Sequence, residues 1–594
     1  MNDIVNRINA YRAEMAKAGV AAALLPRTDD HLSEYISAHW HIVRYLSGFT
    51  GSAATMVITM DKALLWTDSR YFLQAAVQLE GTGVELMKDG LPETPSYTEW
   101  LADNLPAGSA VGINGLLISI NDAAALAEAL AKAGISLDTG FDPTDKVWTD
   151  RPAPSADKAF VHDVKYAGES APSRMERVLE ETRKAGASSY LVSPLDETAW
   201  ILNLRGSDVP HNLPVATAFL YLAPEGSVLF IDEEKMTPEV KAHLDSTGVA
   251  TRPYSEMLGF LSRLPEEEKV LVSGDRTPKA VADALEGRAV KAPSPLQMLK
   301  AVKNATQIEG VRNAHIRDGV AMVRSLMEIE ALVKAGKTFT ELDAEEIILR
   351  HRKEQDLFMD VSFDTIAGFG PNGAIVHYSA TPETNATVAE GSLLLLDSGG
   401  NYLDATTDIT RTIAIGKPTA EMRHDFTLVM KGHIAIATAI FPEGTRGHQL
   451  DAMARMPLWK EGKSYLHGTG HGVGLFLSCH EGPQSIRLND TMAPLVPGML
   501  TSNEPGLYLS GRYGIRCENL VLTVDHAETE FGKFYAFETV TLCPFDLSLF
   551  DTSIMTADEI GWVNDYHARV CRLLSPALDT EERQWLEAAT KPLV

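Results

Sequence analysis

Cysteine is scarce in this chain of 594 residues. Only four occur, and no two of them form a CxxC pair. This number and spacing argue against a disulfide framework and favour a reducing compartment. The four residues all lie in the last fifth of the sequence: Cys479, Cys517, Cys543 and Cys571.

Long apolar runs are also missing. The first twenty residues alternate charged and apolar side chains at helical spacing. They have neither the apolar stretch nor the small-residue cleavage site of a secretory signal peptide. No apolar run approaches the roughly 20 residues that span a bilayer. We therefore expect a cytoplasmic protein without a membrane partner.

Positive charge is in deficit. Lys and Arg together number 53 against 80 Asp and Glu, which gives a formal net charge of −27 at pH 7. Nucleic-acid binding needs basic patches that displace counterions from phosphates, so this balance argues against a nucleic-acid partner. The hydrophobic fraction of 45% and the charged fraction of 22% are those of an ordinary globular protein.

The length favours two to four domains. Strand-like and helix-like patterns alternate down to about residue 140, which indicates an α/β domain, and a tract rich in Pro and Asp at 141–158 has the composition of a linker. The next segment repeats features of the first, because YLSGFTGS (45–52) corresponds in position to WILNLRGS (200–207). This repetition predicts two domains of similar fold and common ancestry, although any two α/β domains resemble each other loosely.

A third segment follows a Pro-containing tract near residue 295 and opens with a long helix predicted over about 306–333. The predicted domains are therefore 1–150, its repeat 151–303, and 304–594. An acidic helical extension occupies about 547–594 of the last domain.

Four carboxylates and one histidine of the third domain stand in contexts suited to metal ligands. Four acids that converge without cations would repel one another and take up protons. Oxygen ligands combined with one imidazole suit Mn²⁺, Zn²⁺ or Co²⁺. We therefore predict a two-metal hydrolytic centre formed by Asp397, Asp408, His471, Glu504 and Glu518.

Each carboxylate alone is weak support. Asp397 ends the apolar run LLLLD but precedes SGGNY, so it could equally be a solvated turn residue. Antiparallel pairing of that strand with the β-branched strand after Asp408 would bring both carboxylates to one face. Asp404 is interpreted as a turn residue between these strands. Arg411 is either a partner of the ligands or a surface cation.

Three histidines fall within fourteen residues, interleaved with glycine, in the stretch HGTGHGVGLFLSCH. Glycine disfavours a helix here and lets the backbone approach a ligand closely. A lone histidine is usually structural, but the cluster of His467, His471 and His480 indicates a functional site. Arg516 precedes Glu518 by two residues, on the same face of a predicted strand, where it could hold the bridging carboxylates.

At these residues the sequence resembles the metallopeptidase family with the pita-bread fold, and within it the three-domain Xaa-Pro aminopeptidases. The resemblance implies an α/β (α+β) fold of two creatinase-N-like domains followed by a pita-bread catalytic domain. One departure is Cys517, which stands beside Glu518 and is either an oxidation-sensitive thiol or a buried inert one. The matching stretches include YLSGFTGSAA, LWTDSRYFLQA, KAVKNATQIEG, HYSA, DSGGNYLDATTDITRT, HGTGHGVG, HEGPQSI, TSNEPGLY and IRCENL.

Carried over residue by residue, the resemblance assigns roles to the five ligands. Asp397 becomes a terminal ligand of one metal, Asp408 and Glu518 bridge both metals, and His471 and Glu504 complete the second. The implied cofactor is a pair of divalent ions, Mn²⁺ first, with Zn²⁺ and Co²⁺ as alternatives.

The resemblance also implies catalytic and substrate-binding residues around the metals. Glu504 is the expected general base, and His480 and His377 are expected to stabilise the reaction intermediate. The substrate site is expected to include His377, His467 and His480. Arg70, in the first domain, is a further substrate-binding candidate.

The implied reaction releases the N-terminal residue from short peptides with proline in second position, through a hydroxide that bridges the metals. A homodimer is implied as well, with Trp459 as either an interface or a core residue. Prolidase, which cleaves only Xaa-Pro dipeptides, remains an alternative, although the duplicated first half argues against it. A non-catalytic peptide-binding module of this fold is a second alternative, although all five ligand types are present.

Overall fold

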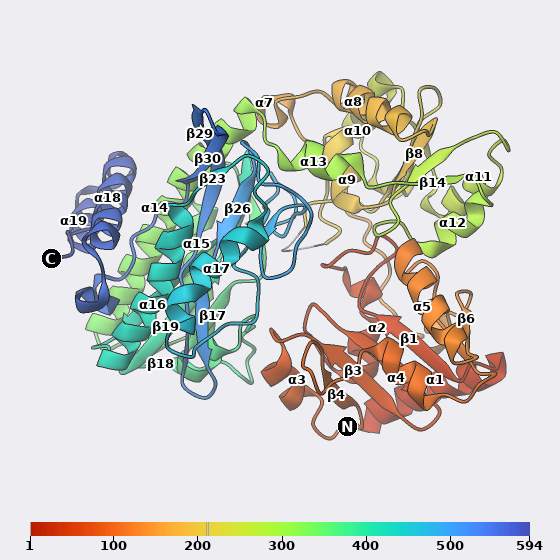
Figure 1. The fold of residues 1–594 in the computed structure, drawn as a ribbon, viewed down its shortest axis with the longest axis horizontal. Coiled ribbons are helices and arrows are strands. Elements are labelled where there is room, and N and C mark those ends of the chain that lie inside the picture. The colour runs from red at the N-terminus through yellow and green to blue at the C-terminus, as the bar shows by residue number, and fades with distance from the viewer. Residues whose placement is uncertain (1, 210, 212) are drawn as a thin grey trace. The chain divides into compact units, whose positions relative to one another are not determined.

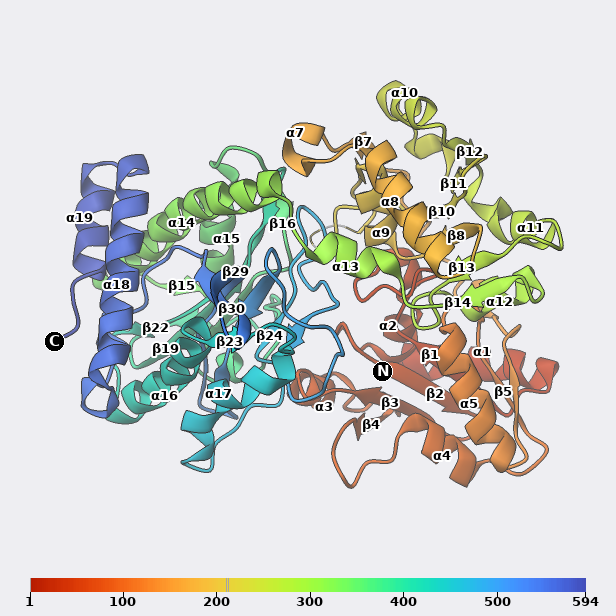
Figure 2. The same cartoon turned by 45° about the horizontal axis from the view of Figure 1, so that its top comes forward.

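The computed structural model describes residues 2–209, 211 and 213–594. It divides into two compact units (Figures 1 and 2). Unit 1 comprises Met1–Val164 and Glu169–Leu296, and unit 2 comprises Lys165–Gly168 and Gln297–Val594. Within the described residues, no helix combines the length and the apolar character needed to cross a membrane.

Unit 1 contains two six-stranded mixed sheets of identical topology. The strand orders are β4-β3-β2-β1-β5-β6 and β12-β11-β10-β8-β13-β14. In each sheet the β1-β2-β3 or β8-β10-β11 pairings are antiparallel and the other three pairings are parallel. The strands are β1 Ala22–Pro26, β2 Thr55–Thr59, β3 Ala63–Thr67, β4 Glu85–Lys88, β5 Ala110–Gly112, β6 Ser136–Asp138, β8 Ser189–Val192, β10 Phe219–Leu222, β11 Val228–Phe230, β12 Ala250–Arg252, β13 Val270–Val272 and β14 Ala289–Lys291.

The two sheets also have matching helix ends at the positions that the predicted repeat aligns. Helix α2 (Ile42–Ser47) ends at Gly48, and helix α9 (Leu195–Leu202) ends at Asn203, both in the left-handed conformation. Glycine and asparagine are the two residues that most readily adopt this helix-terminating conformation. The remaining helices of unit 1 that cover the sheets are α1 Asn2–Ala18, α3 Phe72–Gln78, α4 Tyr97–Asn104, α5 Ile120–Lys132, α8 Ala171–Lys184, α10 Pro238–Thr247, α11 Met257–Ser262 and α12 Lys279–Leu285.

The tract predicted as a linker is irregular only in part. It contains the short helix α6 (Thr144–Val147), and regular structure then stops until β7 (Phe160–Val161), which pairs with β9 (Leu204–Arg205). Helix α7 (Val164–Ala167) follows β7. The second connecting tract forms helix α13 (Pro295–Ala301), from which the chain enters unit 2.

Unit 2 opens with the long helix α14 (Ala305–Lys334), one residue longer at each end than predicted. Asn304 begins it with a capping box, because its side chain and that of Gln307 each accept from the other's backbone N–H. Three further helices, α15–α17, flank the strands of this unit (Figures 1 and 2). They are α15 Glu341–Lys353, α16 Ala420–Ala437 and α17 Gly447–Trp459.

The strands of unit 2 form two main antiparallel sheets, β17-β19-β22 and β23-β30-β29-β26. Their members are β17 Ile366–Phe369, β19 Ser392–Ser398, β22 Ile409–Ile415, β23 Ile440–Pro442, β26 Leu500–Asn503, β29 Asn519–Thr529 and β30 Gly532–Thr539. The smaller strands are β15 Phe339–Thr340, β16 Phe358–Val361, β18 Thr387–Val388, β20 Gly400–Tyr402, β21 Ala405–Thr406, β24 Gly470–His471, β25 Ser485–Ile486, β27 Gly506–Leu509 and β28 Tyr513–Arg516.

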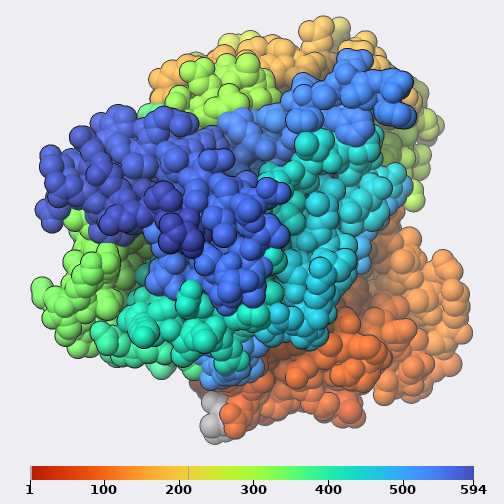
Figure 3. Space-filling model, turned by 60° about the vertical axis from the view of Figure 1, so that its left-hand side comes forward, coloured from red at the N-terminus to blue at the C-terminus, as the bar shows by residue number. Residues whose placement is uncertain are grey.

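The predicted extension forms two helices, α18 (Ala557–Leu574) and α19 (Thr580–Ala589), which both contact α14. In the space-filling view this dark blue segment lies directly against the green and teal parts of unit 2 (Figure 3). Val563, Val570 and Leu574 of α18 are buried in the same apolar cluster as Phe426 and Val429 of α16. The extension is therefore part of the core of unit 2.

Candidate metal centre

The four predicted carboxylate ligands stand at strand ends of the two main sheets, and His471 ends β24 of the small β24-β25 sheet. Asp397 is the penultimate residue of β19 and pairs with Thr410 of β22, while Asp408 directly precedes β22. On the other sheet, β26 pairs with β29 so that Asn503 is opposite Asn519. Glu504 follows Asn503 and Glu518 precedes Asn519, so both glutamates lie directly beyond the last paired residues. The antiparallel pairing expected for the two aspartates is thus present.

Glu518 differs from its predicted setting in one respect. The sequence pattern placed it inside a continuous strand, but β28 ends at Arg516 and β29 begins at Asn519. The break lets the Glu518 backbone N–H donate to the Thr410 carbonyl (3.2 Å), which joins the two main sheets at the ligands. Alternation alone could not reveal this break, because it arises from the crossing of two sheets.

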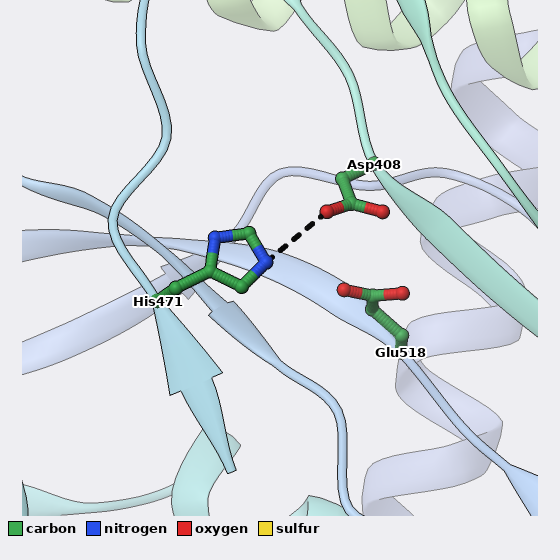
Figure 4. Close-up of side chains that lie close together, drawn as sticks. All are labelled: Asp408, His471 and Glu518. Carbon is green, nitrogen blue, oxygen red and sulfur yellow. Dashed lines mark ion pairs between the residues drawn. The ribbon is translucent and has the colours of Figure 1, made fainter. Parts of the chain in front are cut away.

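Three of the five side chains converge (Figure 4). One ligand atom from each of Asp408, His471 and Glu518 lies within 4.8 Å of the other two. The His471 Nε2 atom lies 3.4 Å from Asp408 Oδ2 and 3.4 Å from Glu504 Oε1. His471 therefore links the Asp408–Glu518 pair to the fourth predicted ligand.

Ser502 orients both His471 and Glu504. Its hydroxyl accepts from the His471 backbone N–H (2.9 Å) and donates to Glu504 Oε1 (3.0 Å). The His471 Nδ1 atom lies 2.9 Å from the Gly472 carbonyl. Because that contact requires a proton on Nδ1, it leaves Nε2 of the neutral imidazole free to act as a ligand.

The fifth ligand, Asp397, is held by Arg516 (Nη2–Oδ2 2.5 Å). The same guanidinium donates to the Tyr508 hydroxyl (2.8 Å), which in turn lies 2.8 Å from His467 Nε2. Arg516 thus contacts a predicted ligand, but its carboxylate partner is Asp397 and not one of the two carboxylates expected to bridge the metals. The chain of contacts connects Asp397 to the predicted substrate-site residue His467.

The charges of this cluster are unbalanced without a cation. Burial, assisted by the charges of Asp408, Glu504 and Asp397, raises the pKa of Glu518 well above its usual range. Burial also raises the pKa of Asp397 to about 6, against the opposing effect of Arg516. Desolvation lowers the pKa of His471, but its contact with Asp408 and the charge of Glu504 outweigh this effect and raise the pKa to about 9. The cluster therefore holds on to protons that a metal ion would displace.

The donor set fits a pair of divalent cations. Four carboxylates and one imidazole are the ligands that Mn²⁺, Zn²⁺ and Co²⁺ accept. Asp397 Oδ1 is buried, and within residues 2–209, 211 and 213–594 it has no hydrogen-bond partner. A buried carboxylate oxygen left without a donor is costly unless a cation occupies its free side.

The remaining predicted histidines border the cluster. The His480 ring lies 4.3 Å from the His471 ring and 6.3 Å from the His377 ring, as centroid distances. Glu341, fully buried at the start of α15, holds the loop of His377 by accepting from the Tyr378 hydroxyl and from the backbone N–H groups of Phe369 and Ala386. His480 therefore lies next to the predicted ligand His471, and His377 lies next to His480.

Three other candidates have contacts of their own. Arg70 lies in unit 1, where it donates to both oxygens of Asp68 (2.9 and 2.7 Å). Asp404 occupies the turn between β20 and β21, as expected, and forms an ion pair with Arg317. Arg411 is fully buried and not a surface cation: it donates to the carbonyl of Glu518 (2.6 Å).

Sequence reasoning missed several contacts to the ligands. Thr410 donates to Glu518 Oε2 (2.7 Å), and the Cys479 thiol lies 3.2 Å from Asp408 Oδ2. Burial raises the pKa of both the Cys517 and the Cys479 thiols, and Cys479 is the one that contacts a predicted ligand. The position of Thr410, two residues from Asp408 along an extended segment, was the signal that could have identified it.

Gly470→Ala is expected to impair the site, because a Cβ at Gly470 would lie 1.9 Å from the Ser502 carbonyl oxygen. The added methyl group would separate β24 from β26 and so move His471 away from Glu504. We expect kcat/KM to fall by about 100-fold, the usual cost of a misplacement of about 1 Å. Gly468→Ala is the matched control, since its nearest atom lies at 3.4 Å, and equal losses in the two variants would contradict this account.

Comparison with known proteins places the chain in a family. Residues 309–525, which include all five ligands, match metallopeptidase family M24, and residues 533–593 match the C-terminal region of that family. Residues 7–140 and 150–307 each match a creatinase/prolidase N-terminal domain. Aminopeptidase P2 of Arabidopsis thaliana is 41% identical, covering 97% of this chain and 86% of its own. The chain belongs to the Xaa-Pro aminopeptidase P family.

Two further relatives agree with this membership. A probable Xaa-Pro aminopeptidase P of Laccaria bicolor is 42% identical over 99% of this chain and 93% of its own. The crystal structure of an X-prolyl aminopeptidase from Caenorhabditis elegans has a TM-score of 0.96 and 36% identity, and covers 99% of this chain and 100% of its own. That enzyme is described as cytosolic, with a di-nuclear active site. The predicted fold, with two creatinase-type domains before a pita-bread domain, is confirmed.

Proposed function

We propose that this chain is a two-metal exopeptidase that releases the N-terminal residue from short peptides with proline in second position. The observation that carries the proposal is the convergence of Asp408, His471 and Glu518, with Glu504 adjacent, in a member of the Xaa-Pro aminopeptidase P family. Hydrolysis follows from the ligand set, and the preference for proline follows from the family.

The five residues would hold two divalent ions, proposed to be Mn²⁺, with Asp408 and Glu518 shared between them. When bound, the ions supply a Lewis acid for the scissile carbonyl and lower the pKa of a water molecule. Asp397 would anchor one ion, and His471 and Glu504 the other. This assignment is supported by the free Oδ1 atom of Asp397 and by the 3.4 Å approach of His471 Nε2 to Glu504.

Glu504 is the proposed general base. It is only partly buried, and Ser502 fixes one of its oxygens. It would take the proton of the attacking water and return it to the nitrogen of the leaving proline. That nitrogen belongs to a tertiary amide with no hydrogen of its own, so its departure without a proton would be very poor.

His480 and His377 are proposed to donate hydrogen bonds to the negative charge that develops on the scissile carbonyl. This proposal is supported by the His480 ring, which lies 4.3 Å from the His471 ring and 6.3 Å from the His377 ring. His467 is proposed to shape the pocket for proline, with its Nε2 atom facing the Tyr508 hydroxyl. Arg70 remains a proposed substrate contact from the first domain. We propose domain boundaries at 1–150, 151–303 and 304–594.

The function is tested with a panel of peptides after chelation and reconstitution with Mn²⁺, Zn²⁺ or Co²⁺. We expect release of arginine from Arg-Pro-Pro and little cleavage of the dipeptide Gly-Pro. The reverse preference would identify a prolidase. Two divalent ions per chain after dialysis are expected, whereas none would revive the non-catalytic alternative. A cytosolic location, as described for the relative from Caenorhabditis elegans, is tested by cell fractionation.

We also propose a homodimer formed through α17. Met453, Met456 and Trp459 follow one another at intervals of three along this helix and are each about two-fifths exposed. Three large apolar side chains on one exposed face are typical of an interface. Met456→Asp should convert a dimer to a monomer in sedimentation velocity without lowering Tm. A monomeric wild-type protein at micromolar concentration would exclude the dimer.

A further inference from the structure

Three buried charges of unit 2 lie outside the metal site. Lys300, Lys303 and Glu481 are each 4% exposed. The Lys300 Nζ atom lies 2.7 Å from Glu481 Oε2, and the Lys303 Nζ atom lies 3.1 Å from Glu481 Oε1. We call these three residues the lysine clamp. It joins two conspicuous stretches of the sequence, KAVKN at 300–304 and HEGPQ at 480–484.

Glu481 is also fixed through its backbone. Its N–H donates to the Gly472 carbonyl (2.7 Å), directly after the ligand His471. A Cβ on Gly472 would lie 2.0 Å from the Glu481 carbonyl oxygen, and a Cβ on Gly474 would lie 2.7 Å from Glu481 Oε2. The glycines of HGVG therefore make room for Glu481, and the two histidine-bearing segments interlock around it.

Lys303 is anchored as firmly as its partner. Its backbone N–H donates to the Gly498 carbonyl (2.9 Å), and its ammonium group donates to the Lys300 carbonyl (3.1 Å). The next residue, Asn304, begins helix α14. The clamp thus ties the His480 segment to the rigid start of the longest helix in the unit.

Stability alone does not account for this arrangement. Burying charges is expensive, and apolar replacement of a buried ion pair is often neutral or even stabilising. What an ion pair adds is a defined geometry. His480 directly precedes Glu481, and no helix or strand is described between His471 and β25. The His480 carbonyl accepts from the Ser478 hydroxyl (2.8 Å), and the next residue, Glu481, is paired with Lys303 just before α14.

We propose that Lys300 and Lys303 are positioning residues that act through Glu481 to hold His480 over the metal site. The proposal rests on the catalytic role proposed for His480. The clamp fixes the backbone on which the imidazole stands, and it does not touch the substrate.

The test compares Lys303→Met with Lys303→Arg and with a control, Lys235→Met. Lys235 is a buried lysine of unit 1 that is paired with Asp208 (2.6 Å). We expect Lys303→Met to lower kcat by about 10- to 100-fold with little change in KM, as a displaced catalytic group would. Lys303→Arg should restore most of the rate. Lys235→Met should lower Tm but leave kcat intact, and an equal kcat loss there would overturn the proposal.

A double variant separates positioning from general damage. In a His480→Ala background, Lys303→Met should have less than about a twofold further effect on kcat, because the group that it positions is already absent. A full additional loss would overturn the proposal. If Lys303→Met does not fold, Lys300→Met is the second variant, because it leaves the Lys303–Glu481 ion pair intact. Its effect on kcat should likewise be smaller in the His480→Ala background than in the wild type.

Amide hydrogen exchange tests whether the lysine clamp holds the His480 segment, and it requires neither substrate nor metal. Lys303→Met should lower the protection of residues 470–486 and leave the rest of unit 2 unchanged. Unchanged protection of this segment would overturn the proposal. If His480→Ala alone leaves kcat intact, the role proposed for His480 fails, and the exchange result still shows whether the clamp holds the segment.

Discussion

Glu504→Ala should abolish the hydrolysis of Arg-Pro-Pro while the fold persists. The change removes a proton-transfer group, typically worth 10²–10⁴-fold, together with a proposed metal ligand, so kcat should fall by at least about 10³-fold. The fold should persist because the Glu504 side chain is partly exposed, and the hydrogen bond that it accepts from Ser502 is a small loss. Its negative charge also raises the pKa of Glu518 and Asp397, so its loss relieves repulsion in the metal-free protein.

Two companions sharpen this experiment. Glu528→Ala, an exposed glutamate on β29, is the matched control and should keep wild-type kcat. Glu504→Gln keeps the shape and one oxygen ligand, so an inactive variant with two bound ions would assign the loss to proton transfer. A near wild-type rate for Glu504→Ala at saturating metal would refute both roles of this residue.

Glu518→Gln should destroy activity and yet stabilise the metal-free protein at pH 8. The folded-state pKa of Glu518 is raised well above its usual range by burial and by three other carboxylates. A folded state that keeps this proton loses stability as the pH rises from the unfolded value of about 4.3 toward the raised folded value. Glutamine cannot ionise, so this loss disappears while the Thr410 donor still finds an oxygen.

Calorimetry with and without Mn²⁺ measures both halves of this prediction. Metal at 100 times its Kd stabilises a protein by about 2.7 kcal/mol, and the variant should lack this gain. Glu341→Gln is the control, and it should destabilise the metal-free protein. Both oxygens of the buried Glu341 carboxylate accept hydrogen bonds, and glutamine has only one oxygen to accept them. A lower Tm for metal-free Glu518→Gln than for metal-free wild type would contradict the proposed repulsion.

Local patterns in the sequence predicted much of the fold. Alternating strand and helix signals revealed the duplicated domains, and the correspondence of YLSGFTGS with WILNLRGS located helix ends that prove to be equivalent, at Gly48 and Asn203. The interior of the tract at 141–158 was predicted less well. It contains a helical turn at Thr144–Val147 that its proline content concealed.

The ligand residues could be anticipated from residue type and context, but their contacts could not. Arg411 carried no local signal of burial, because three of its carbonyl acceptors, those of Glu518, Cys543 and Pro544, lie more than 100 residues away. Cys479 likewise meets Asp408 only through the tertiary fold. Periodicity reports which face of a strand is buried, whereas contacts between strand ends depend on how whole sheets meet.

The position of Tyr566 on α18 affects when, during its own synthesis, the protein can begin to hydrolyse peptides. Its hydroxyl accepts from Arg411 (3.0 Å) and bonds the carbonyls of Thr541 and Cys543, so the last helices complete the shell that holds Glu518. At ribosomal speed, α18 follows Glu518 by roughly 2 to 10 seconds. We therefore expect every predicted ligand to leave the ribosome before this shell is complete, and a nascent chain to hydrolyse peptides only after its final helices have docked.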